Sequence, residues 1–104
     1  MIEQVYQLTQ TTEKTIEKVL GDERMHYMHM VLPKGEGLPE HTTNSNVYMT
    51  VVKGTLNICL EEEPEQIYEQ GTLLTIPFGI KMNAYNVHDE TLELIVVKVP
   101  APGN

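Results

Sequence analysis

Apolar and polar residues alternate along several short segments of this 104-residue chain, and Gly or Pro separates most of them. The clearest pair covers residues 47–52 and 55–60, in which nearly every second residue is apolar. Alternation with a period of two predicts strands that bury one face. Lys53-Gly54 lies between the two segments and predicts a tight turn, so the pair is expected to form a hairpin.

Five further strands are predicted from the same pattern: residues 25–32, 66–68, 72–76, 81–87 and 92–99. The last of these is apolar at both alternating sets of positions, which indicates burial on both faces. Eight or nine short strands at even spacing, with no convincing long helix, predict an all-β barrel or sandwich. We expect one domain, spanning residues 1–104.

Two segments near the N-terminus leave alternatives open. Residues 15–20 place Ile16, Val19 and Leu20 at helical spacing, but the β-branched residues and the turn-forming pair Gly21-Asp22 favour a strand. Residues 2–8 alternate less regularly. They predict either a short edge strand or an arm that pairs with a partner subunit.

Charge and composition narrow the range of partners. The formal net charge is −8, with seven Lys and Arg against fifteen Asp and Glu, which argues against nucleic-acid binding. No run approaches the roughly 20 apolar residues of a membrane-spanning helix, and no signal peptide is visible. Cys59 is the single cysteine, so there is no internal disulfide. We therefore expect a cytoplasmic protein with no membrane or nucleic-acid partner.

Two sets of spacings in the chain resemble those of a known superfamily. Five residues separate Gly35 from His41, Thr43 follows, three residues separate it from Val47, and six more precede Gly54. This pattern over residues 35–54 resembles the first cupin motif, which reads Gly, five residues, His-x-His, three or four residues, Glu, six residues, Gly.

The second cupin motif reads Gly, five residues, Pro-x-Gly, two residues, His, three residues, Asn. Residues 71–86 match it without a gap, at Gly71, Pro77, Gly79, Met82 and Asn86. Two matches in the right order resemble the small single-domain cupins, with their cupin-2-like conserved barrel. The resemblance implies a single antiparallel β-barrel of the jelly-roll type.

The metal-ligand positions of the resemblance are degenerate. In metal-bearing cupins the two His and the Glu of the first motif and the His of the second bind the ion. The matching positions here are His41, Thr43, Val47 and Met82, so one strong ligand of four remains. The resemblance therefore implies the barrel without the usual metal, and no cofactor is predicted.

A metal site of another kind stays as an alternative. Imidazole and thioether ligands suit Cu(I), so His41 and Met82 are weak candidates for a soft-metal or divalent site. The competing interpretation is that methionines fill irregular core space. His26 and His29 fall on opposite faces of one strand, so they cannot share a site, and each is expected to be hydrogen-bonded or at the surface.

The resemblance also places the polar run 42–46 beside the mouth of the barrel. The run is either a polar lip that orients a ligand or an ordinary loop with Asx turns. Strand parity from Val47 directs Met49 and Val51 inward. Tyr85 is an alternative to Asn86 as a polar point. The predicted pocket is mostly apolar and consists of His41, Thr43, Val47, Met49, Met82 and Asn86.

Three functions follow from this interpretation. The first is a cupin barrel that binds a small, fairly apolar molecule without a standard metal site. The alternative is a cupin enzyme, either an isomerase or lyase or an atypical metal-dependent oxygenase, with His41 as the sole catalytic candidate. The third is a structural or regulatory module that acts as a dimer. We expect a small-molecule ligand and a homodimer.

Overall fold

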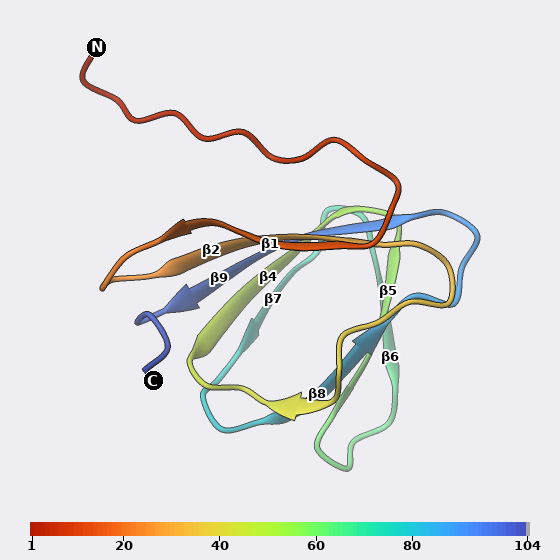
Figure 1. Ribbon diagram of the computed structural model, residues 1–104. Helices are drawn as coiled ribbons and strands as arrows, with labels where there is room; N and C mark the ends of the chain where they lie inside the picture. The colour runs from red at the N-terminus through yellow and green to blue at the C-terminus, as the bar shows by residue number, and fades with distance from the viewer. Residues whose placement is uncertain (104) are drawn as a thin grey trace.

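The computed structural model describes residues 1–103, and this range contains nine β-strands and no helix (Figure 1). The strands are β1 (Thr15–Gly21), β2 (His26–Leu32), β3 (His41–Thr42), β4 (Asn46–Lys53), β5 (Thr55–Leu60), β6 (Gln66–Glu69), β7 (Leu73–Ile76), β8 (Lys81–Tyr85) and β9 (Leu92–Val99). The predicted all-β class is confirmed. The two-residue strand β3 overlaps the predicted polar lip and was not expected.

The strands form two antiparallel sheets. The larger has the order β1-β2-β9-β4-β7 and the smaller has the order β3-β8-β5-β6 (Figure 1). Within residues 1–103 the hydrogen-bond ladders stay separate, so the expected barrel is a two-sheet jelly roll. Its core lies between the sheets, because inward side chains of both sheets belong to one buried cluster.

Strand parity determines which residues enter this core. On β4, Val47, Met49 and Val51 are each at most 2% exposed, as the alternation predicted. On β5, Leu56 and Ile58 are buried in the same way. Each of these strands therefore directs every second side chain toward the space between the sheets.

Strand β9 lies in the middle of the larger sheet, between β2 and β4. Its even-numbered residues from 92 to 96 are buried, and its odd-numbered residues from 93 to 97 are half-buried. The prediction that this strand is covered on both faces is thus met fully on the inner face and partly on the outer one.

The N-terminal region resolves one alternative and corrects another. Residues 15–20 belong to β1, which pairs with β2 through the predicted turn, so the helical alternative is wrong. Residues 2–8 form no strand, so the edge-strand prediction is wrong within this chain. They form an extended arm that projects from the body (Figure 1). Pairing of the arm with a second subunit stays a prediction.

The turns use glycine where the backbone requires it. Gly35, Gly54, Gly71 and Gly79 have φ angles of 87°, 85°, 92° and 84°. At Gly54 a Cβ would also lie 2.7 Å from the carbonyl oxygen of Thr91, so both the conformation and the space favour glycine. Among residues 1–103, no helix has the length and apolar character needed to cross a membrane.

Candidate functional site

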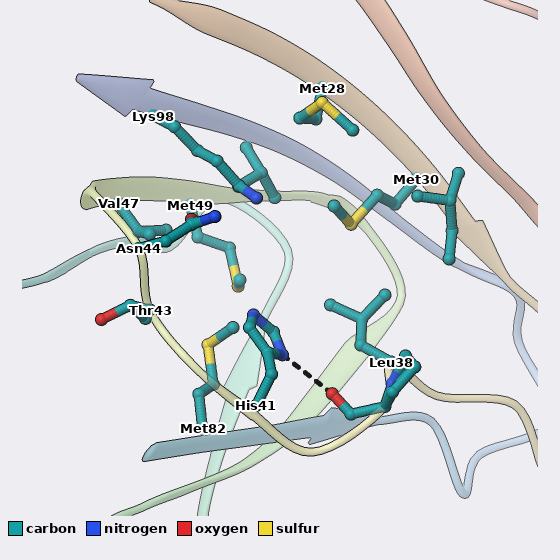
Figure 2. Close-up of a pocket in the computed structure, with 13 residues that line it drawn as sticks. Met28, Met30, Leu38, His41, Thr43, Asn44, Val47, Met49, Met82 and Lys98 are labelled. Carbon is teal, nitrogen blue, oxygen red and sulfur yellow. Dashed lines mark hydrogen bonds between the residues drawn. The ribbon is translucent and has the colours of Figure 1, made fainter. Parts of the chain in front are cut away.

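A cavity of about 180 Å³ lies between the two sheets (Figure 2). It is lined by side chains of β1, β2, β4, β8 and β9, by His41 of β3, and by residues on either side of β3. Nine of its thirteen lining residues are apolar, and four of these are methionines: Met28, Met30, Met49 and Met82. The interior is therefore apolar, sulfur-rich and adaptable in shape.

Four lining residues are polar, and they differ in exposure. Asn44 is exposed, Thr43 is buried, and His41 and Lys98 are half-buried. Within residues 1–103, no carboxylate contributes to the lining. Any polar recognition inside the cavity therefore rests on these four side chains.

His41 begins β3 and lies opposite Met82 of β8. Its Nδ1 is 2.8 Å from the carbonyl oxygen of Pro39. A carbonyl oxygen only accepts hydrogen bonds, so Nδ1 carries a proton. In the neutral ring, Nε2 is then left as an acceptor, and Figure 2 shows the ring directed toward Met49 and Met82. His41 can thus present one polar atom to the cavity.

Thr43 lines the cavity, but its hydroxyl group is committed elsewhere. The hydroxyl donates to the carbonyl oxygen of Pro77 at 2.8 Å and accepts from the backbone N–H of Ile80 at 2.9 Å. Two backbone hydrogen bonds join Thr43 to Ile80 and Gly79 in the same turn. The side chain therefore fastens the segment after β3 to the β7–β8 turn, and Figure 2 shows its oxygen directed away from the cavity.

Val47, Met49 and Met82 also line the cavity. Val47 and Met49 reach it from β4 by strand parity, and Met82 reaches it from β8. The structure thus brings five of the six predicted pocket residues together, from motifs that are far apart in sequence. Their contact with a ligand stays a prediction.

Asn86 and Tyr85 do not line this cavity. The amide of Asn86 is buried and donates to the carbonyl oxygens of Leu32 and Glu90, at 2.9 and 3.0 Å. The hydroxyl of Tyr85 bonds Glu65 instead. Asn86 therefore joins the end of β2 to the loop before β9, because a buried amide needs backbone partners.

Lys98 lies in the cavity wall, although the sequence interpretation did not single it out. Figure 2 shows its side chain directed from β9 toward the space that the lining residues surround. Burial lowers the pKa of its amino group. No carboxylate in residues 1–103 forms an ion pair with it. The sequence alone could have indicated this position, because Lys98 lies on the same strand face as residues 92, 94 and 96, which point inward.

The donor set around His41 does not fit the metal of metal-bearing cupins. The three other matching positions offer a hydroxyl that is already bonded twice, an aliphatic group and a thioether. No group of three or more His, Cys, Asp or Glu side chains in the described range is arranged to hold an ion. Hard divalent ions prefer imidazole and carboxylate ligands, so we derive no chemistry through such a metal.

A different polar cluster lies on the opposite face of the larger sheet. His29 of β2 is fully buried, and its ring nitrogens lie 2.6 Å from Glu17 of β1 and 2.6 Å from Glu93 of β9. Ionised carboxylates only accept hydrogen bonds, so this geometry calls for a protonated imidazole. The expectation that His29 is a hydrogen-bonded histidine is confirmed.

The pKa values in this cluster follow from its contacts. Burial of the ring lowers the pKa of His29, but the hydrogen bonds to Glu17 and Glu93 outweigh it, and the net shift is upward. The hydrogen bond from His29, and then those from Thr9, lower the pKa of Glu17 to about 2. Thr9 donates its backbone N–H and its hydroxyl to Glu17, so the cluster also holds the base of the N-terminal arm.

Comparison with known proteins gives relatives along nearly the whole chain. The uncharacterised protein MJ0764 of Methanocaldococcus jannaschii is 37% identical over 103 residues, which cover 98% of this chain and 89% of that protein. The crystal structure of the same protein, described as an RmlC-like cupin family protein with a double-stranded β-helix fold, has a TM-score of 0.94 to this chain. It covers 98% of this chain and 94% of that structure.

Two more distant structures show the fold alone. The protein TT1209 of Thermus thermophilus has a TM-score of 0.77 at 23% identity, with 86% of each chain covered. The conserved SPY1581 protein of Streptococcus pyogenes, of unknown function, has a TM-score of 0.77 at 18% identity, with 98% of this chain and 93% of that chain covered.

The family model for the Cupin domain matches residues 28–98, from within β2 to the lysine in the cavity wall. Both sequence motifs lie within that range, and the two sheets have the arrangement seen in the relatives. This chain belongs to the cupin family.

Proposed function

We propose that this protein binds a small, largely apolar molecule in the cavity between its sheets, without the metal centre of metal-bearing cupins. The observation that carries the proposal is the cavity itself, which has nine apolar and four polar lining residues. Apolar clefts with a small number of placed polar groups are the usual form of a small-molecule site.

The size of the cavity limits the ligand. Pockets for drug-sized molecules measure roughly 300–1,000 Å³. The cavity here, about 180 Å³, corresponds to about six water molecules at roughly 30 Å³ each. We therefore expect a ligand of about six to ten non-hydrogen atoms, with methionine side chains adjusting around it.

The methionines allow a direct test with an internal control. Four of the six methionines line the cavity, whereas Met1 and Met25 do not. With the methionine methyl groups labelled with carbon-13, titration with pentanamide should shift the NMR signals of Met28, Met30, Met49 and Met82. The signals of Met1 and Met25 should stay in place. Binding that shifts none of the four cavity methyls would contradict the proposal.

The metal part of the proposal has its own test. Protein purified without added ions should carry far less than one equivalent of Fe, Mn, Zn or Ni, because one imidazole is a weak site for these ions. A stoichiometric ion whose removal perturbs the signals of Met49 and Met82 would contradict this part.

A second candidate, an acid–base enzyme, rests on the geometry of His41. Its Nδ1 proton is held by Pro39, so Nε2 is available to take a proton from a bound molecule. An isomerase or lyase that removes a proton next to a carbonyl group would use such a base. The probe is 4-oxopentanoate in D2O, whose protons next to the ketone should exchange faster with wild type than with His41→Ala. Equal rates would exclude this candidate.

We also propose that two copies of the chain pair, with the arm of each lying on its partner. The arm carries Ile2 and Val5, which are 101% and 60% exposed in the single chain. Exposed apolar side chains on an extended segment gain free energy when a second subunit covers them. Light scattering at micromolar concentration should give the mass of a dimer, and Ile2→Asp with Val5→Asp should weaken it. A monomeric mass for wild type would contradict the pairing.

A further inference from the structure

The charge of the cavity differs from the charge of the protein. The chain has fifteen acidic residues and a net charge of −8, yet none of the acidic side chains lines the cavity. The charged lining residue among those described is Lys98 of the larger sheet, and the imidazole of His41 lies across the cavity on the smaller sheet. The described lining residues therefore give this cavity a positive local charge within an acidic protein.

The other lysines show what Lys98 lacks. Lys14, Lys34 and Lys81 form ion pairs with Glu36, Asp89 and Glu62, at 3.1, 2.7 and 3.2 Å. Lys18 and Lys53 form none within the described residues, but they are exposed and water solvates them. Lys98 is half-buried, and burial lowers its pKa. Its ammonium form therefore loses water without gaining a counter-ion from residues 1–103.

We propose that the ligand of this cavity is a small organic anion, a carboxylate with a short apolar body, whose charged group pairs with Lys98 while its body packs against the methionines. This inference rests on the proposed function and names its ligand class. The protein supplies the cation and the apolar wall, and the ligand supplies the missing negative charge. A charge-assisted hydrogen bond in a partly desolvated site is among the stronger single polar contacts.

The same lysine argues against a metal cation as the occupant. Four methionines and His41 line the cavity from both sheets, and together they are a donor set that suits Cu(I). A cation in this cavity would lie near the ammonium group of Lys98, with no carboxylate among the described lining residues to offset the repulsion. The charge arrangement thus favours an anion over a soft metal ion.

The experiment compares two probes of equal size. Pentanoate and pentanamide each have about seven non-hydrogen atoms, which fits the cavity, and they differ in charge. Calorimetric titration would measure the affinity of both for wild type, for Lys98→Met and for Lys34→Met. Lys34 is an exposed lysine outside the cavity, so Lys34→Met is the control for the loss of one positive charge.

Wild type and Lys34→Met should bind pentanoate about tenfold or more tightly than pentanamide, as expected for one charge-assisted hydrogen bond. Lys98→Met should lose this preference and keep its affinity for pentanamide, which also shows that the variant is folded. The preference of wild type should decrease as salt is added.

The outcomes separate the two proposals. Equal affinity of wild type for both probes, or a preference that persists in Lys98→Met, would overturn the anion inference and leave the cavity as a site for neutral molecules. If wild type bound neither probe, the proposed function would fail, and this inference with it.

Discussion

The larger sheet carries a cationic side chain on each of its faces, and the surroundings of the two side chains are opposite in kind. On the outer face, His29 lies between Glu17 and Glu93, and each of its ring nitrogens has a partner at 2.6 Å. On the inner face, Lys98 points into a cavity to which the described residues contribute no carboxylate. Strand β9 contributes to both, through Glu93 outward and Lys98 inward.

The comparison distinguishes a polar group that the fold itself uses from a polar group that a ligand can reach. Both ring nitrogens of His29 already have a hydrogen-bond partner within the protein. The cluster therefore stabilises the junction of β1, β2 and β9, and the imidazole has no nitrogen left to bind a ligand. Lys98 is held in an apolar wall and forms no ion pair within residues 1–103, so solvent or a bound molecule is left to satisfy its charge. Removing the side chain of His29 should therefore lower the stability of the fold, whereas removing that of Lys98 should raise it.

The largest effect is expected at His29. The substitution His29→Gln leaves at least one carboxylate of Glu17 and Glu93 without its donor, next to a second negative charge. We expect the free energy of unfolding to fall by about 2 kcal/mol, less than for a fully buried ion pair because both glutamates are partly exposed. Urea unfolding monitored by circular dichroism would measure it.

The matched control is His26→Gln, on the same strand. His26 has no side-chain hydrogen bond or ion pair within the described residues, so the loss should stay within about 0.5 kcal/mol. Equal losses for the two variants would mean that the Glu17–His29–Glu93 contacts do not stabilise the fold.

The pH dependence of stability should come from the same cluster. The pKa of His29 is raised above the ordinary histidine value of about 6.5. Its contribution to stability is therefore complete below about pH 6.5 and is lost as the pH rises through the higher pKa of the folded state. The pKa of Glu17 is lowered to about 2, so its contribution is complete above about pH 4.5 and is lost as the pH falls toward 2.

The stability difference between wild type and His29→Gln should therefore be largest between about pH 4.5 and about pH 6.5, and should shrink on the alkaline side. Unfolding curves at about pH 5.5, 7 and 8.5 would measure this difference. A difference that stays constant or grows with rising pH would contradict a protonated His29 between two carboxylates.

A smaller effect of opposite sign is expected at Lys98. Lys98→Met removes a partly desolvated amino group and adds apolar surface to an apolar wall. The free energy of unfolding should rise by about 0.5 kcal/mol, near the upper limit for partly exposed positions. Lys34→Met is the control, because its ion pair with Asp89 is exposed and contributes little. If Lys98→Met were as destabilising as His29→Gln, the contrast between the two faces would be wrong.

The local pattern of apolar and polar residues predicted most of the fold, because most core residues are the inward-facing members of alternating strands. The alternation in residues 47–52 directs Val47 and Met49 into the cavity, and the motif spacings bring His41 next to Met82 across the β3–β8 pair. These features depend on period and spacing, which are visible along the chain. The arm at residues 2–8 alternates less regularly and pairs with no strand of residues 1–103, so the prediction of an edge strand from its pattern was wrong within this chain.

The polar partners were harder to predict because they come from distant segments. Thr43 bonds Pro77, 34 positions away, and Asn86 bonds Leu32, 54 positions away, so both side chains are used by the scaffold. Nothing local to either residue indicates this. Lys98 was missed for another reason: the apolar run of residues 92–99 predicts burial, and the charged residue near its end was not assigned to the inner face.

The most direct test of this account is the pKa of the Lys98 amino group, measured by NMR with and without a saturating probe. In the free protein it should lie below the ordinary lysine value of about 10.4, because burial disfavours the charged form. Pentanoate should raise it by supplying the missing counter-ion, and pentanamide should not. An ordinary value in the free protein, or a value that pentanoate leaves unchanged, would contradict the claim that the cavity keeps a lysine for an anionic ligand.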